Sequence, residues 1–336
     1  MSSASVPSSR NGSSAEINTP APVALFVYNR ADNTRRTLQA LLANTLAPQT
    51  ELYVFSDGGR DEASWAAVRE VRAVLQEVKE DVSRTHSLYR MTIVERPTNY
   101  YLERNVLEGI NEVFAHHDTI IVLEDDIVTA PYFLQYMNDA FALYRDNPRV
   151  MHVSGFTRLE GALSASSNGS SYFSPFMAGW GWGTWRDRWQ QHFCHYQSRA
   201  EALCGLTTAM LDALEYGGVF PCLKHLDRQP IPWDLCWSIA IRRADGLCLY
   251  PTRTLVRNIG LDSGTHYGFI PKWLVPLLQR YEYDREPSAT PVVLKRQEPT
   301  VNPTIEAKMR VALTDWGVRY TWLGRLLRCL KTLFRN

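Results

Sequence analysis

Short apolar runs alternate with amphipathic segments along the first half of this chain, and this alternation most constrains its fold. Four apolar runs are expected to form strands: Val23–Tyr28, Leu52–Phe55, Met91–Val94 and Thr119–Leu123. Between these runs, apolar residues recur every three or four positions, as they do in an amphipathic helix. Because strands and helices in this order pack as a parallel sheet covered by helices, the sequence predicts an α/β fold with a mostly parallel sheet.

Three carboxylates, Glu124-Asp125-Asp126, follow the fourth predicted strand directly. In open α/β sheets, ligands bind just beyond the carboxyl ends of the strands. Clustered carboxylates repel one another, and a divalent cation such as Mg²⁺ or Mn²⁺ relieves the repulsion and can bridge a diphosphate. The sequence therefore predicts a metal–nucleotide site here. The alternatives are that Asp126 caps a helix beginning near Pro131, or that the acids are merely solvated.

Local turn and cap signals place the neighbouring elements. Thr34 is expected to cap a helix that continues to Leu42. Ser56-Asp57-Gly58-Gly59 is a turn sequence after the second strand. Gly161–Ser171 is small and polar, which predicts a loop, and the aromatic content rises sharply between Phe173 and Trp189.

Composition narrows the class of protein. At 336 residues the chain suits one large domain or two small ones, and a net charge of +1 gives no argument for a nucleic-acid partner. The six cysteines show no paired CxxC spacing, which predicts reduced thiols in a cytosolic protein. The sequence shows no run long enough for a membrane span and no signal peptide, so a cytoplasmic location is expected.

Taken in order, the motifs resemble a GT-A glycosyltransferase from about Val23 to Phe269. The nearest resemblance is to bacterial family-2-like sugar transferases, with a more distant similarity to the N-acetylglucosaminyltransferase I family. The residues that carry it are Tyr28-Asn29-Arg30, Ser56-Asp57-Gly58, Asn105-Val106-Leu107-Glu108-Gly109-Ile110, Glu124-Asp125-Asp126, Trp180-Gly181-Trp182-Gly183-Thr184-Trp185, Trp233-Asp234, Asn258-Ile259-Gly260 and Gly264-Thr265-His266. The resemblance implies a Rossmann-like GT-A domain over residues 21–275, whose aromatic part forms the acceptor half. A disordered tail is expected over 1–20 and a C-terminal extension over 276–336.

The resemblance also implies an activity. This is the inverting, metal-dependent transfer of a sugar from a nucleotide sugar, expected to be UDP-linked, to a hydroxyl of a glycan or lipid-linked acceptor. Such a reaction would serve the synthesis of a bacterial surface polysaccharide or lipopolysaccharide. One alternative is a sugar nucleotidyltransferase, although Tyr28–Asp32 is not the glycine-rich basic loop that this class should carry. Another is a glycan- or membrane-binding adaptor without catalysis, against which the intact Asp126 and Asp234 argue.

Two residues at the ends of the first two strands are candidates for nucleotide binding. The resemblance implies that Arg30 and Asp57 contact the base. An aspartate can accept the imide N–H of uracil, and an arginine can hydrogen-bond to the ring or stack on it. The alternatives are a solvated arginine at a helix start and an aspartate that only forms a turn.

The resemblance further implies a set of metal-binding residues. Asp126 is the implied direct ligand of Mn²⁺ or Mg²⁺, with Glu124 and Asp125 acting through water or on the ribose. His266, after the loop Asp262–Thr265, is implied to complete the metal shell, and imidazole suits Mn²⁺ acceptably. The alternative is a loop histidine that contacts a phosphate or orders a lid.

Asp234 is the predicted general base, because a carboxylate within reach of the acceptor hydroxyl can take its proton. Trp233 and Trp237 are expected to surround this carboxylate and to raise its pKa by desolvation. The alternative is that Asp234 is the N-cap of a helix over Leu235–Ile241, and one aspartate can fill both roles.

Tryptophan and glycine alternate over Gly179–Trp185. Glycine lets the backbone approach a ligand, and an indole face can stack on the apolar face of a sugar. Trp182 is therefore the predicted sugar contact, and the alternative is that the tryptophans form a core.

The C-terminal end carries a basic amphipathic segment. Between Arg319 and Phe334, an apolar stripe faces a row of basic residues. This pattern suits an anionic membrane surface, which would place the protein peripherally on the inner face of the cytoplasmic membrane. A helix docked on the protein's own core is the alternative.

Overall fold

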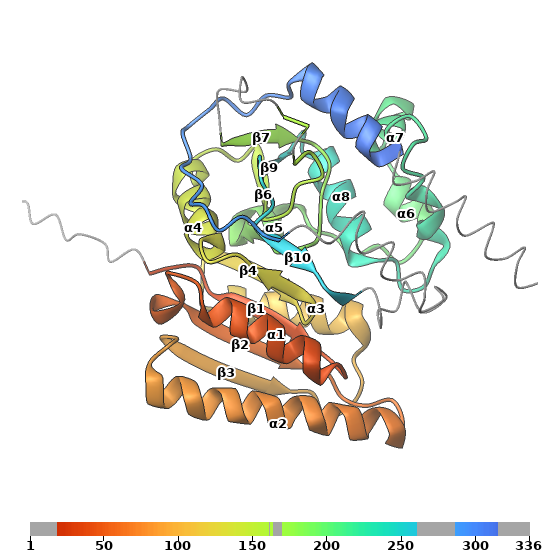
Figure 1. The fold of residues 1–336 in the computed structure, drawn as a ribbon. Coiled ribbons are helices and arrows are strands. Elements are labelled where there is room, and N and C mark those ends of the chain that lie inside the picture. Colours follow the sequence, from red (N-terminus) through yellow and green to blue (C-terminus); the bar gives the residue numbers. More distant parts are fainter. Residues whose placement is uncertain (1–18, 161, 164–169, 261–285, 315–336) are drawn as a thin grey trace, which may run out of the picture.

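The computed structural model describes residues 19–160, 162–163, 170–260 and 286–314. Its centre is an eight-stranded sheet with the order β3-β2-β1-β4-β8-β6-β9-β7 (Figure 1). The strands of this sheet are β1 (Val23–Val27), β2 (Glu51–Ser56), β3 (Arg90–Glu95), β4 (Thr119–Glu124), β6 (Val150–Ser154), β7 (Ser171–Ser174), β8 (Trp182–Trp185) and β9 (Leu247–Pro251). A separate two-stranded ribbon pairs β5 (Ile127–Thr129) antiparallel with β10 (Val256–Asn258).

Helices connect and cover these strands. The α-helices are α1 (Ala31–Leu42), α2 (Glu62–Thr85), α3 (Tyr101–Phe114), α4 (Phe133–Tyr144), α5 (Arg186–His192), α6 (Arg199–Leu203), α7 (Thr208–Leu214) and α8 (Trp233–Arg243). Two short 3₁₀ helices are η1 (Ala47–Gln49) and η2 (Leu223–Asp227), and residues 303–314 are also helical.

The first half of the sheet is parallel, and the second half is mixed. Strands β3, β2, β1 and β4 run parallel to one another, with a helix in each connection, as the sequence predicts. Strand β8 is antiparallel to both of its neighbours, and β7 is antiparallel to β9. The predicted α/β fold is thus confirmed. The aromatic segment joins the same sheet through β8 and forms no separate sheet of its own.

The two faces of the sheet have separate hydrophobic cores, because successive strand residues point to opposite sides. Leu25 faces the core that α1, α2 and α4 cover, whereas Phe26 faces the core that α3, α5 and α8 cover. Met309 and Leu313, from the helix over 303–314, are buried in the second core. The described part of the predicted C-terminal extension therefore packs on the sheet.

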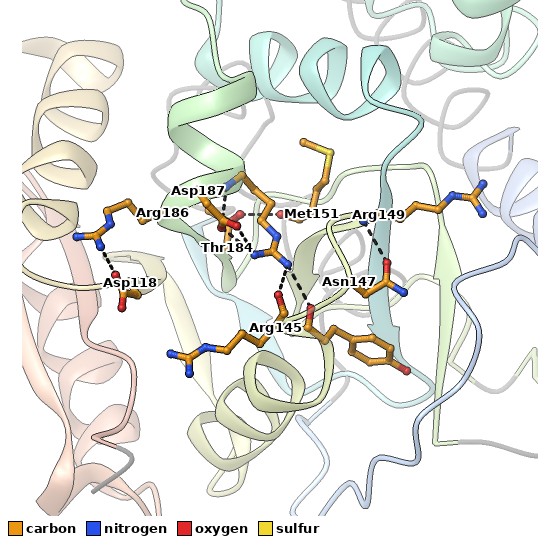
Figure 2. Close-up of polar contacts among 10 residues, drawn as sticks. Asp118, Arg145, Asn147, Arg149, Met151, Thr184, Arg186 and Asp187 are labelled. Carbon is orange, nitrogen blue, oxygen red and sulfur yellow. Dashed lines mark hydrogen bonds and ion pairs between the residues drawn. The ribbon is translucent and has the colours of Figure 1, made fainter. Parts of the chain in front are cut away.

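Polar contacts at the ends of three strands fix β8 between its neighbours (Figure 2). Arg186, just after β8, forms an ion pair with Asp118, just before β4. Thr184 Oγ1 donates to the Met151 carbonyl of β6 at 2.6 Å. In the resulting register Trp182, the first residue of β8, lies opposite Val122, near the carboxyl end of β4.

Three predicted helix starts differ from the structure. Helix α1 begins at Ala31, and Thr34 lies inside its first turn, where Oγ1 donates to the Arg30 carbonyl at 2.9 Å. Helix α4 follows Tyr132, while Asp126 lies in the turn between β4 and β5, so Asp126 is not its cap. Helix α8 begins at Trp233 after Pro232, which places Asp234 in the first turn rather than at the N-cap.

Two further predictions concern the chain as a whole. Within the described ranges, no helix has the length and apolarity needed to cross a bilayer. Each cysteine that the structure describes is a free thiol, in agreement with the predicted reduced state. The basic amphipathic segment 319–334 lies outside the described residues, and so does Cys329.

Candidate active site

Segments that follow β1, β2 and β4 meet at one edge of the sheet. These strands are parallel neighbours, so their carboxyl ends lie side by side. The structure brings Arg30, after β1, against Asp125 and Asp126, after β4. With Glu124 these residues form what we call the acidic edge. It lies where α/β sheets bind their ligands.

Arg30 joins the two aspartates of the acidic edge. Its Nε donates to Asp125 Oδ2 at 3.2 Å, and its Nη2 forms a close ion pair with Asp125 Oδ1. Its Nη1 donates to Asp126 Oδ2 at 3.0 Å. Burial by itself lowers the pKa of Arg30, but the charges of the two aspartates raise it by more. The guanidinium is therefore engaged by carboxylates, and a contact with a nucleotide base stays a prediction.

Negative charge accumulates at this edge. Burial, followed by the charges of Asp126 and Asp125, raises the pKa of Glu124, and Arg30 only partly offsets the effect. Burial also raises the pKa of Asp125. Asp234 adds to the rise at Glu124, so the fold brings this distant residue within electrostatic reach of the acidic edge. A further positive charge would be stabilised here.

The two carboxylate oxygens of Asp126 differ in their contacts. Oδ2 accepts from Arg30, whereas Oδ1 is buried and accepts no hydrogen bond from the described residues. The backbone of β10 continues over the turn, where Ile259 N donates to the Asp126 carbonyl at 2.8 Å. A Cβ added to Gly260 would lie 2.0 Å from Asp126 Oδ2, so a larger residue there would displace the Asp126 carboxylate. The motif Asn258–Gly260 thus lies directly on the acidic turn.

The fit to a divalent cation rests on the free oxygen of Asp126. A buried carboxylate oxygen without a donor suits a hard cation such as Mg²⁺ or Mn²⁺. In the described ranges, no group of three or more histidine, cysteine, aspartate or glutamate side chains is arranged to hold a metal ion. His266 lies outside the described residues. Mg²⁺ commonly uses one or two carboxylates and completes its shell with substrate phosphates and water, and the acidic edge fits that pattern.

Asp57 is buried and turned toward the loop after β3. Its Oδ1 accepts from Gly58 N at 2.8 Å and from Tyr100 N at 2.7 Å, and its Oδ2 accepts from Asn99 Nδ2 at 3.1 Å. Burial raises the pKa of Asp57, and hydrogen bonds from Tyr100, Gly58 and Tyr101 oppose the rise. Because α3 has no side-chain cap of its own, Asp57 caps this helix from the end of β2.

Asp234 and its flanking tryptophans do not form the predicted pocket. Trp233 and Trp237 are buried at 4% and 0% exposure, whereas Asp234 is exposed. Its Oδ1 accepts from Leu235 N at 2.8 Å within the first turn of α8. The expectation that the two tryptophans surround the carboxylate is wrong, because the helix points them into the core and points Asp234 outward.

Trp182 is a core residue. Its exposure is 0%, and its ring is stacked between His152 and Trp233, with centroid distances of 5.2 and 5.3 Å. The predicted stacking on a sugar is therefore wrong for this conformation, and the alternative of a tryptophan core holds. The alternation of tryptophan and glycine reflects strand β8, which sends Trp182 and Trp185 to opposite faces of the sheet.

Two residues that support the site were missed in the sequence. Thr37 is buried in α1, and its Oγ1 donates to the Asp125 carbonyl at 2.9 Å, which holds the acidic turn against the helix. Asn99 donates to Asp57 and, at 2.6 Å, to the Gly58 carbonyl. A buried threonine within a helix gives a weak signal, and Asn99 stands in an ordinary loop sequence. Their roles emerge only from the fold.

The fold defines an α/β protein, and the acidic edge is its candidate ligand site, at the carboxyl ends of the parallel strands. The chain belongs to the GNT-I family of glycosyltransferases, because the model of that family matches residues 4–196, more than half of its length. The predicted similarity to the N-acetylglucosaminyltransferase I family is thereby confirmed.

The individual proteins that resemble this chain share little sequence identity with it. The chain is 26% identical over 179 residues to an alpha-1,3-mannosyl-glycoprotein 2-beta-N-acetylglucosaminyltransferase of Arabidopsis thaliana, a match that covers 51% of this chain and 38% of that protein. Two solved structures are similar at 13% identity. The mannosyltransferase PcManGT from Pyrobaculum calidifontis, in complex with GDP-Man and Mn²⁺, has a TM-score of 0.37 with 91% of this chain and 88% of that one covered. S. aureus TarS 1–349 has a TM-score of 0.33 with 51% and 48% covered.

Proposed function

We propose that this protein transfers a sugar from a nucleotide sugar to a hydroxyl group of a glycan, with the help of a divalent cation. Membership of the GNT-I family supports the reaction class. The observation that carries the proposal is the acidic edge, where a buried oxygen of Asp126, beside Arg30, has no partner in the part of the chain that the structure describes. The curated relative transfers N-acetylglucosamine, as its name states, and we extend this to UDP-N-acetylglucosamine as the donor to test first.

The acidic edge would bind the diphosphate end of the donor. Asp126 would hold the cation through its free oxygen, and a bound Mn²⁺ or Mg²⁺ would stabilise the charge of the leaving diphosphate. Thr37 and Arg30 keep the turn in place and balance part of its charge.

Asp234 is the proposed general base. It lies in the first turn of α8, is exposed, and is within electrostatic reach of Glu124. An exposed carboxylate beside the donor site can accept the proton of an incoming hydroxyl as that hydroxyl attacks the anomeric carbon. Attack from the side opposite the diphosphate would invert the anomeric configuration.

Calorimetry with UDP tests the metal site. Asp126→Ala should abolish the gain in UDP affinity that Mn²⁺ gives the unchanged protein, because the proposed direct ligand is lost. Asp146→Ala, which removes an exposed aspartate after α4, is the matched control and should behave as the unchanged protein. An Asp126→Ala variant that keeps the full effect of Mn²⁺ would refute the assignment.

Kinetics with a glycan acceptor test the base. Asp234→Asn keeps the size of the side chain but cannot take a proton, so turnover should fall by roughly 10²–10⁴-fold. Donor affinity should stay the same, because the group acts on the acceptor. NMR of the product should show inversion at the anomeric carbon, and retention would exclude direct displacement.

A further inference from the structure

One tryptophan of the glycine-rich segment differs from its neighbours in exposure. Trp180 precedes β8 and is half-buried. A half-buried indole keeps part of its apolar surface in water, and a ligand with an apolar face would remove that surface from water. Trp180 is therefore the tryptophan of this region that a ligand can reach. The tryptophans of β8, α5 and α8 are at most 4% exposed: Trp182, Trp185, Trp189, Trp233 and Trp237.

Trp180 lies at the same end of the strands as the acidic edge. Strand β8 is antiparallel to β4 and begins at Trp182, opposite Val122, so the residues just before β8 lie next to those that follow β4. Strand β6 is also antiparallel to β8, with Ser154 opposite Trp182. The segment before β8 thus meets the carboxyl ends of both β4 and β6.

The two glycines that flank Trp180 reach from the acidic turn to the proposed base. A Cβ on Gly181 would lie 3.5 Å from the side chain of the first residue of β5, which directly follows Asp126. A Cβ on Gly179 would lie 3.8 Å from the ring of the first residue of α8, which directly precedes Asp234. Trp180 is therefore placed between the proposed metal site and the proposed base. The reaction requires the acceptor hydroxyl between these same two groups.

Phe156 holds the Trp180 ring in place. The two rings meet edge to face at 63°, with their centroids 4.7 Å apart, a geometry that stabilises aromatic pairs beyond their burial. The turn that carries Phe156 is itself fixed, because Ser154 Oγ accepts from Phe156 N at 3.2 Å. Gly155 N donates to the Gly181 carbonyl at 2.7 Å and joins this turn to the segment before β8. The orientation of the indole is thus set before a ligand binds.

We propose that Trp180 stacks on a pyranose ring of the acceptor, and that Phe156 is the positioning residue that orients the indole. This inference rests on the proposed function and assigns the binding site of the acceptor sugar. One face of a pyranose carries C–H groups that match a flat aromatic surface, whereas its equatorial hydroxyls point outward. Stacking on Trp180 brings an acceptor hydroxyl toward Asp234 and leaves the acidic edge to the donor.

Steady-state kinetics with UDP-N-acetylglucosamine as donor separate an acceptor contact from a donor contact. The acceptor probe is whichever of the methyl glycosides of mannose, glucose and galactose is turned over fastest. Trp180→Leu keeps apolar packing on the core that α1, α2 and α4 cover but has no flat ring, so the acceptor KM should rise roughly ten- to hundredfold. The donor KM and the UDP affinity should stay the same, and Trp180→Phe should lose less. An unchanged acceptor KM, or a weakened donor, in a folded Trp180→Leu variant overturns the proposal.

Saturation-transfer NMR tests the contact without turnover. With UDP and Mn²⁺ present, protons on one face of the sugar should receive saturation from aromatic protons of the unchanged protein, and Trp180→Leu should abolish this transfer. Tyr89→Ala removes an exposed ring just before β3, at the opposite end of the strands, and should keep it. Absence of transfer to all three sugars in an unchanged protein that binds UDP overturns the proposal. Failure of the unchanged protein to bind UDP would instead refute the proposed function.

Discussion

The acidic edge and the aromatic layer beside it lie close together but are built in opposite ways. We define the aromatic layer as five buried residues: His152, Trp182, Trp189, Trp233 and Trp237. The neighbouring Trp180 is half-buried and lies outside this set. The members of the layer pack on one another through stacked rings, and Trp237 Nε1 donates to His152 Nδ1 at 3.4 Å, while Trp182 Nε1 is buried with no partner among the described residues. The acidic edge instead carries like charges held together by Arg30. Changes in the layer should therefore affect stability, and changes at the edge should affect both stability and binding.

The largest expected effect is the loss of Trp182. Trp182→Ala leaves a cavity between His152 and Trp233, and the free energy of unfolding should fall by about 3–5 kcal/mol. Urea unfolding measures this change. Trp182→Phe keeps a ring in the stack and should cost clearly less. A stability of Trp182→Ala equal to that of the unchanged protein would mean that the layer is not a core.

Removal of Arg30 should have the next largest effect and should depend on metal. Arg30→Met leaves Asp125 and Asp126 without their counter-charge, so the free energy of unfolding should fall by about 3 kcal/mol in the presence of a chelator. Added Mn²⁺ should raise the melting temperature more in this variant than in the unchanged protein, because the cation replaces the lost charge.

Another arginine of the same helix provides the control for this experiment. Arg35 pairs with Glu77 on the exposed face of α1, and Arg35→Met should leave stability and the Mn²⁺ response unaltered, because exposed ion pairs contribute little. If Arg30→Met and Arg35→Met behave alike, Arg30 is not needed to hold the acidic edge together.

The smallest expected effect is a pH dependence from the aromatic layer. His152 is neutral, since Nε2 donates to the Ala178 carbonyl at 3.2 Å while Nδ1 accepts from Trp237, and burial lowers its pKa to about 3. Below the ordinary histidine pKa of 6.5 the unfolded chain binds a proton that the folded protein does not. Stability should therefore fall as the pH drops below 6.5, with a slope of about 0.7 kcal/mol per pH unit at pH 6.5 that approaches about 1.4 kcal/mol per pH unit near pH 5.

Comparison with His152→Phe isolates the contribution of His152 to the pH dependence of stability. That variant keeps a ring in the stack and has nothing to titrate at this position. Chemical denaturation at pH 6.5, 5.8 and about 5 gives the two slopes, whose difference should equal the expected value. Equal slopes would show that His152 is accessible to protons in the folded state.

The prediction of the parallel half succeeded because its signals are local. Apolar runs such as Val23–Val27 are buried on both faces, and the residues that follow them must meet at one edge of a parallel sheet. The acidic turn could be placed beside Arg30 on this ground alone. The same reasoning failed for Trp182, since tryptophans in a glycine-rich strand look alike whether they face a sugar or a core.

The sequence by itself determined the α/β class, the order of the first strands and the edge at which the carboxylates gather, since hydrophobic periodicity and strand direction suffice for these. Only the tertiary structure decided which partner each polar group has. In the fold Asp57 accepts a hydrogen bond from Tyr100 N at the start of α3, and Arg30 pairs with Asp125 and Asp126. Asn99 and Asp126 each keep one acceptor atom without a partner among the described residues. Hydrogen bonds reach only about 3 Å, so they depend on long-range packing that no local pattern encodes.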